Sequence, residues 1–139
     1  MTSIITEEMQ EAMQGVVPST LVTCSKTGIP NTNYISQVYY VDEEHVALSH
    51  QFFSKSIRNI DENPQVAVSI VHPESFQMWR LDLVFSHKET DGDLYDQMSL
   101  QLEAIASMTG MEDVFHLLSA YIFKVVGIQI IVWMYLPLT

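Results

Sequence analysis

The sequence predicts a mainly β fold, a small and mostly antiparallel β-barrel with helices on its periphery. Three observations support this class. The length of 139 residues fits one domain, expected over residues 1–139. Six or seven segments are rich in the β-branched and aromatic residues that strands prefer. Only three segments show a helical pattern, so the strands dominate the core.

The expected strands are short runs separated by turn residues. The clearest is residues 65–71, where Val66, Val68 and Ile70 alternate with other residues, as in a half-buried strand. In the last strand, Gly127 interrupts an apolar run and predicts a bulge or a bend. The full set of predicted strands covers residues 21–25, 32–41, 46–49, 65–71, 77–88, 114–118 and 121–132.

Three helices are expected between these strands. The first begins after Thr6, a good N-cap residue, and ends at Gly15. The second covers residues 54–63 and ends before Pro64, because a residue that precedes proline avoids the helical region. The third follows Asp91-Gly92-Asp93 and ends at Gly110; its predicted apolar stripe is Leu94, Met98, Leu102, Ile105 and Met108.

Charge and composition exclude several classes of function. The net charge of −11 argues against nucleic acid and anionic membranes as partners, because phosphates need basic patches. The apolar run at residues 125–138 is too short to span a bilayer, and acidic residues near the start argue against a signal peptide. A single cysteine, Cys24, excludes an intrachain disulfide and favours a cytoplasmic location.

Common nucleotide and metal motifs are also missing from the sequence. The five glycines build neither G-x-G-x-x-G nor a Walker loop. The five histidines lack the spacing of metal ligands, so no metal site is expected.

The start of the second predicted helix is a candidate anion site. Ser54 can cap this helix, and Lys55 and Arg58 supply two of the six basic residues in an acidic chain. A phosphate there would meet the positive end of the helix dipole. The alternative is that the two basic side chains only solvate an exposed helix face.

Several motifs in this region resemble those of one family. They are G-I-P-N, a long polar strand, a returning strand, S-K-x-x-R-N-I-x-x-N-P and V-x-V, then W-R-L-D-L-V-F and E-T-D-G-x-L-Y-D-Q-M. In this order, over residues 6–130, they resemble the pyridoxamine 5'-phosphate oxidase-like family of FMN-binding split barrels. The resemblance implies a six-stranded antiparallel split β-barrel that forms a homodimer, with FMN bound in the clefts between subunits.

The resemblance also implies a set of cofactor-binding residues. Ser54 and Lys55 match the phosphate-binding pair of the family, with Arg58 as a further phosphate contact. Trp79, with Arg80 next to it, would reach the flavin across the dimer. Two further segments would lie along the ribityl chain and the flavin ring: Asn33, Tyr34, Ile35 and Ser36 in the second strand, and Ser49 and His50 at the end of the returning strand.

The sequence departs from the family pattern at sites that bear on function. Asn33 stands where true oxidases tend to have arginine, Ser56 replaces an expected basic phosphate ligand, and the C-terminal extension that binds pyridoxal phosphate is missing. The expected function is therefore that of an FMN-dependent oxidoreductase with an unknown small-molecule substrate or a reduced nicotinamide as donor. No general acid or base is assigned. A non-catalytic flavin- or ligand-sensing module and a cofactor-free dimeric scaffold remain the alternatives.

Overall fold

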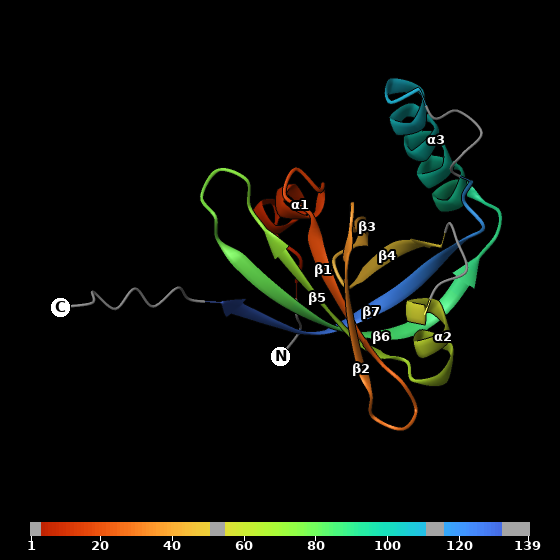
Figure 1. The fold of residues 1–139 in the computed structure, drawn as a ribbon. Helices are drawn as coiled ribbons and strands as arrows, with labels where there is room; N and C mark the ends of the chain where they lie inside the picture. The colour runs from red at the N-terminus through yellow and green to blue at the C-terminus, as the bar shows by residue number, and fades with distance from the viewer. Residues whose placement is uncertain (1–3, 51–54, 111–115, 132–139) are drawn as a thin grey trace.

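The computed structural model describes residues 4–50, 55–110 and 116–131, which form three helices and seven strands (Figure 1). In chain order these are α1 (Glu7–Met13), β1 (Ser19–Cys24), β2 (Pro30–Ile35), β3 (Tyr39–Asp42), β4 (His45–His50), α2 (Lys55–Glu62), β5 (Gln65–Val71), β6 (Met78–Glu89), α3 (Asp93–Met108) and β7 (Ser119–Ile131). No helix within these ranges is long and apolar enough to cross a membrane.

The seven strands form one antiparallel sheet in the order β2-β1-β5-β6-β7-β4-β3. The long strands β6 and β7 pair at its centre, and β2 and β3 are its two edges. The sheet curves around a core to which most of its strands contribute, so the mainly β, antiparallel class is confirmed.

The bulge predicted at Gly127 is confirmed. Asp82 pairs with Gly127 and the next residue, Leu83, pairs with Val125, so Val126 is the extra residue of β7. A side chain at position 127 would come within 3.1 Å of the Asp82 carboxylate. The bulge bends β7 and increases the twist of the sheet.

The alternating residues of β5 form part of the core, as the sequence predicts. Val66, Val68 and Ile70 of β5 are all buried, whereas the residues between them are not. Helix α1 buries Met9, Ala12 and Met13 against this core. The side-chain oxygen of Thr6 accepts a hydrogen bond from Met9 N, which confirms the predicted N-cap.

Helix α3 packs against a second core and extends beyond the sheet (Figure 1). Met98 and Leu102 are buried there, as predicted. The predicted stripe is wrong for the last turns, because Ile105 is 44% and Met108 is 87% exposed, while Ala106 is buried. The far end of α3 extends beyond the sheet, so the sheet does not cover Ile105 and Met108 (Figure 1).

The single strand predicted over residues 32–41 is two strands, and the sheet has seven strands where the resemblance implies six. β2 pairs with β1 and β3 pairs with β4, so the chain crosses from one edge of the sheet to the other after Ile35. The crossing segment is fixed to α1, where Val38 N donates to Met13 O over 3.0 Å.

The strand predicted over residues 114–118 is not found in its described part. Residues 116–118 form no strand, and β7 begins at Ser119. Residues 111–115, and the end of the strand predicted to reach residue 132, lie outside the described ranges.

Candidate functional site

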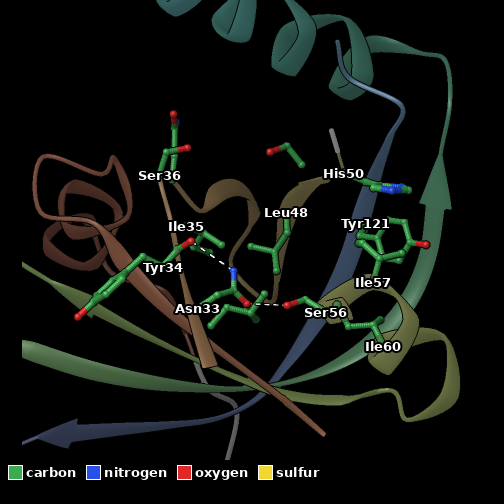
Figure 2. Close-up of a pocket in the computed structure, with 13 residues that line it drawn as sticks. Asn33, Tyr34, Ile35, Ser36, Leu48, His50, Ser56, Ile57, Ile60 and Tyr121 are labelled. Carbon is green, nitrogen blue, oxygen red and sulfur yellow. Dashed lines mark hydrogen bonds between the residues drawn. The ribbon is translucent and has the colours of Figure 1, made fainter. Parts of the chain in front are cut away.

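A cleft of about 250 Å³ lies where β2, β4, β7 and α2 approach one another (Figure 2). Apolar side chains, including Leu48, Ile57 and Ile60, form much of its wall. The complete lining consists of Leu21, Asn33, Tyr34, Ile35, Ser36, Gln37, Leu48, Ser49, His50, Ser56, Ile57, Ile60 and Tyr121.

Six of the residues predicted to bind a cofactor meet in this cleft. β2 and the residue after it bring Asn33, Tyr34, Ile35 and Ser36, and the end of β4 brings Ser49 and His50. The two segments are on strands that do not pair with each other, so only the folded sheet brings them together. Tyr34 is 79% exposed, and its ring points away from the other lining side chains (Figure 2).

The predicted basic residues lie beside the cleft and do not line it. Lys55 is the first residue of α2, directly before the lining residue Ser56, and it is exposed. Lys55 forms no ion pair with any described residue. Arg58 is in the same helix and does not line the cleft, and Ser54 lies outside the described residues.

Trp79 is not brought to this cleft by its own chain. Its side chain is 6% exposed and packs in the main core, where β6 pairs it with Ile70 on one side and Ile130 on the other. Trp79 alternates along β6 with Arg80, whose guanidinium donates to Asp82 over 3.0 Å. Burial in the core therefore explains why this tryptophan is separate from the other predicted residues.

A hydrogen-bonded cluster joins β2 to α2 at one side of the cleft. Ser56 Oγ donates to Asn33 Oδ1 over 2.5 Å and accepts from Asn31 Nδ2 over 3.3 Å. Ser56 is 6% exposed, so its hydroxyl needs these partners. Two positions that depart from the family pattern, Asn33 and Ser56, are thus direct neighbours and form one neutral polar contact.

At the other side of the cleft, His50 stands against Ser119 and Tyr121. His50 Nδ1 lies 3.2 Å from Ser119 Oγ, and the His50 ring meets the Tyr121 ring edge-on at 5.6 Å. His50 Nε2 is buried and has no hydrogen-bond partner among the residues that the structure describes. A buried polar atom without a partner is unusual and requires an explanation.

Tyr121 is itself fixed by a hydrogen bond to α2. Its hydroxyl donates to Asp61 Oδ1 over 3.2 Å. Burial, and then the negative charge and hydrogen bond of Asp61, raise the pKa of Tyr121 to about 12. The phenol therefore stays protonated at neutral pH and acts as a fixed wall of the cleft.

The sequence analysis did not identify Ser56 or Tyr121 as site residues. A signal for Ser56 exists, since Ser56 and Asn59 are polar residues on the buried face of α2. Tyr121 carries no local signal, because only its pairing with Leu48 of β4 places it at the cleft.

The described lining contains no carboxylate, lysine or arginine. A cation lies directly beside the lining in the sequence: Lys55 precedes the lining residue Ser56 and is at the positive end of the α2 dipole. No group of three or more His, Cys, Asp or Glu within the described ranges is arranged to hold a metal ion. The cleft thus suits a ligand with a largely uncharged body, and a negative group on that ligand would find the cation Lys55 next to the lining.

A second cavity of about 400 Å³ lies between α1, the segment after Ser36 and α3. Its polar lining is mostly glutamine amides, including Gln37 and Gln101, which are joined by a hydrogen bond of 3.1 Å. Apart from Gln37, it shares no residue with the first cleft, and it contains none of the predicted site residues.

Several solved structures have a fold similar to that of this chain. An FMN-binding protein from Syntrophomonas wolfei superposes with a TM-score of 0.77 at 16% identity, over 93% of this chain and 87% of that one. HupZ of Group A Streptococcus gives 0.69 at 19% identity, over 91% and 94%. HutZ, a heme storage protein from Vibrio cholerae, gives 0.59 at 23% identity, over 91% and 94%.

Comparison of sequences identifies one relative and one matching family model. An uncharacterized protein of Methanocaldococcus jannaschii is 33% identical over 67 residues, which cover 47% of this chain and only 44% of that protein. The family model described as pyridoxamine 5'-phosphate oxidase matches residues 5–119. This match covers most of the chain and confirms the resemblance, so the chain belongs to the pyridoxamine 5'-phosphate oxidase family.

Proposed function

We propose that this protein binds FMN in the cleft between β2, β4 and α2 and acts as an FMN-dependent oxidoreductase. One observation carries the proposal. Six residues predicted to bind a cofactor, from β2 and β4, which do not pair with each other, meet in one cleft without charged lining residues, next to Lys55. Membership of the family and the fold shared with a protein named as FMN-binding add support.

The residues present fit a flavin. Leu48, Ile57 and Ile60 offer apolar surface to a flat ring, and Asn33 and Ser36 offer polar groups to a hydroxylated chain. A cleft of about 250 Å³ is smaller than the roughly 300–1,000 Å³ of sites that enclose a whole small molecule. Part of the ligand would therefore extend outside the described lining, and Lys55 lies where a terminal phosphate could be held.

In this proposal, FMN and the protein residues have separate roles. FMN, when bound, supplies the electron transfer. The apolar wall excludes water from one side of the ring, and Tyr121, fixed by Asp61, keeps that wall rigid. No described side chain is assigned as general acid or base.

A homodimer is part of the proposal. The open cleft leaves room for a second subunit to cover the ligand, and a two-fold axis would create two equal sites. The last part of β7 carries exposed apolar residues, Val126 at 54% and Ile130 at 65%, which a partner could bury. A cytoplasmic location agrees with the lone free thiol of Cys24.

A second candidate is a flavin- or ligand-sensing module without turnover. It is favoured by the neutral contact between Asn33 and Ser56, which supplies no charge to activate a ring or to steer a charged substrate. The two candidates share the cofactor and differ in whether the bound flavin is turned over.

The visible spectrum of the purified protein tests the proposal. We expect a yellow protein with flavin absorbance, and FMN in the supernatant after denaturation. Reduction by NADH or NADPH with repeated turnover would favour the enzyme over the sensor. A colourless protein that takes up no added FMN would contradict the proposal and leave a cofactor-free scaffold.

A further inference from the structure

We propose that the second cavity, between α1, residues 37–40 and α3, binds a small uncharged molecule that carries a carboxamide on an aromatic ring. This site is separate from the cofactor cleft, with which it shares only Gln37 among the lining residues. The proposal therefore does not rest on the proposed function, and it concerns the protein with or without FMN.

The polar part of the lining consists mostly of side-chain amides. α1 and its C-cap contribute Gln10 and Gln14, α3 contributes Gln97 and Gln101, and Gln37 follows Ser36. Residues four apart lie on one face of a helix, so each helical pair is directed to the same side. Five of the nine glutamines of the chain are thus gathered at one cavity, by three segments that are distant in the sequence.

Most of these amides have unused hydrogen-bonding capacity. Gln37 Nε2 donates to Gln101 Oε1 over 3.1 Å. The side-chain amides of Gln10, Gln14 and Gln97 form no hydrogen bond with any other residue in the described ranges. A glutamine amide both donates and accepts. A carboxamide on a ligand does the same, so it is complementary to the amides that the protein leaves available.

The described lining of the cavity carries no charge. It contains no Asp, Glu, Lys, Arg or His, although the chain has 17 acidic residues. Burial raises the pKa of Tyr39 above its ordinary value of 10.0, so this lining phenol is also uncharged at neutral pH. A charged ligand would lose hydration here without meeting an opposite charge, and this favours a neutral ligand.

The buried part of the lining is apolar or aromatic. It consists of Met13, Val38, Tyr39 and Met98, and the cavity volume of about 400 Å³ lies within the roughly 300–1,000 Å³ of small-molecule sites. The walls are held in place, because Val38 N donates to Met13 O over 3.0 Å and Met98 is buried in the second core. An aromatic ring could contact this buried surface while its carboxamide bonds to the glutamines.

The test uses nicotinamide as the probe and the whole chain without FMN. Nicotinate, with the same ring and a carboxylate in place of the amide, is the matched ligand. The double variant Gln10→Met/Gln97→Met removes one amide from each helix and no side-chain hydrogen bond between described residues. Gln97→Met alone changes only an exposed position. Gln65→Met, at an exposed glutamine of β5 outside this cavity, is the control variant.

In nitrogen-15 NMR spectra, nicotinamide should shift the side-chain amide signals of Gln37 and Gln101 and not that of Gln65, with a Kd on the order of 1 mM for so small a molecule. The double variant should bind about tenfold or more weakly, because two hydrogen bonds are lost, at an unchanged Tm. Gln97→Met should show part of this loss, and Gln65→Met should match wild type. Nicotinate should bind wild type at least about tenfold more weakly than nicotinamide, because the lining has no cation.

Four results would overturn the proposal. If nicotinamide leaves the Gln37 and Gln101 signals unchanged up to its solubility limit, the cavity takes no such ligand. If wild type and the double variant bind equally, the free amides make no contact with it. If affinity falls only in variants whose Tm also falls, the glutamines have a structural role. If nicotinate binds as tightly as nicotinamide, the lining does not select a neutral amide.

Discussion

Gly15 links α1 to the wall of the cleft, and Gly15→Ala should damage both stability and FMN binding. Gly15 has a φ of +85°, and a Cβ there would lie 1.8 Å from the carbonyl oxygen of Ser36. That distance is 1.6 Å less than the 3.4 Å at which ordinary contacts begin. Since the clash is with backbone, a side-chain rotation does not relieve it.

The expected loss of stability has two parts. A left-handed conformation costs an alanine about 1–2 kcal/mol. Relief of the clash requires movement of the segment after Ile35, which would strain or break the Val38 N to Met13 O hydrogen bond, worth about 0.5–1.5 kcal/mol. We therefore expect a loss of about 1.5–3.5 kcal/mol, or roughly 3–4 °C in Tm for each kcal/mol in a domain of this size.

Gly28→Ala is the matched control. Gly28 has a φ of +90° in the β1–β2 turn, and a Cβ there would meet nothing within 4 Å. Urea unfolding of this variant measures the cost of the dihedral angle alone, about 1–2 kcal/mol. FMN affinity should fall only in Gly15→Ala, because Ser36 and Gln37 line the cleft. Equal losses of stability in the two variants would refute the reasoning.

Three further predictions concern charge, protonation and assembly. Lys55→Ala should weaken FMN binding by about ten- to a hundredfold, because it removes one charge-assisted contact of roughly 1.5–3 kcal/mol. The Tm of the cofactor-free protein should stay unchanged. Unchanged FMN affinity in a fluorescence titration would place the phosphate elsewhere. Because the pKa of Tyr121 is raised from 10.0 to about 12 in the folded protein, this residue contributes stability that is present below pH 10 and is lost as the pH rises to about 12. Asp61→Asn should lower that pKa but leave it above 10, since burial is the larger cause, and tyrosinate absorbance would show no such change if the contact were absent. Sedimentation at low micromolar concentration should show a dimer, and a folded monomer would contradict the inter-subunit cleft.

Elements with local signals could be predicted from the sequence. The alternation of Val66, Val68 and Ile70 predicted β5 with its bounds, and Thr6 and Gly15 delimited α1. Gly127 marked the bulge in β7 because glycine tolerates close approach, in this case to Asp82. Each of these signals depends on a few neighbouring residues, so no tertiary information was required.

Features that depend on distant contacts could not be predicted. The break after Ile35 arises because β2 and β3 pair with different strands, and the composition of the segment is equally suitable for one long strand. The contact between Ser56 and Asn33 joins residues 23 positions apart, and only the packing of α2 on β2 brings them together. Trp79 was assigned by resemblance to the flavin of the partner subunit, so its burial in the core of its own chain leaves that assignment a prediction.

The central claim, that FMN binds with its phosphate at the start of α2, is tested most directly by competition between FMN and riboflavin. The two ligands share the ring and the ribityl chain and differ by the phosphate. The dipole of α2 and the charge of Lys55 favour the phosphate, whereas the net charge of −11 opposes it.

The described lining contains no carboxylate, and charges separated by more than about 8 Å are largely screened at physiological ionic strength. The attraction of the phosphate to Lys55 and to the α2 dipole should therefore exceed its repulsion by the net negative charge of the protein. A competitive titration, followed by quenching of flavin fluorescence, should show tighter binding of FMN, with a preference that narrows but does not reverse as salt is added. Equal affinities for FMN and riboflavin would contradict the account.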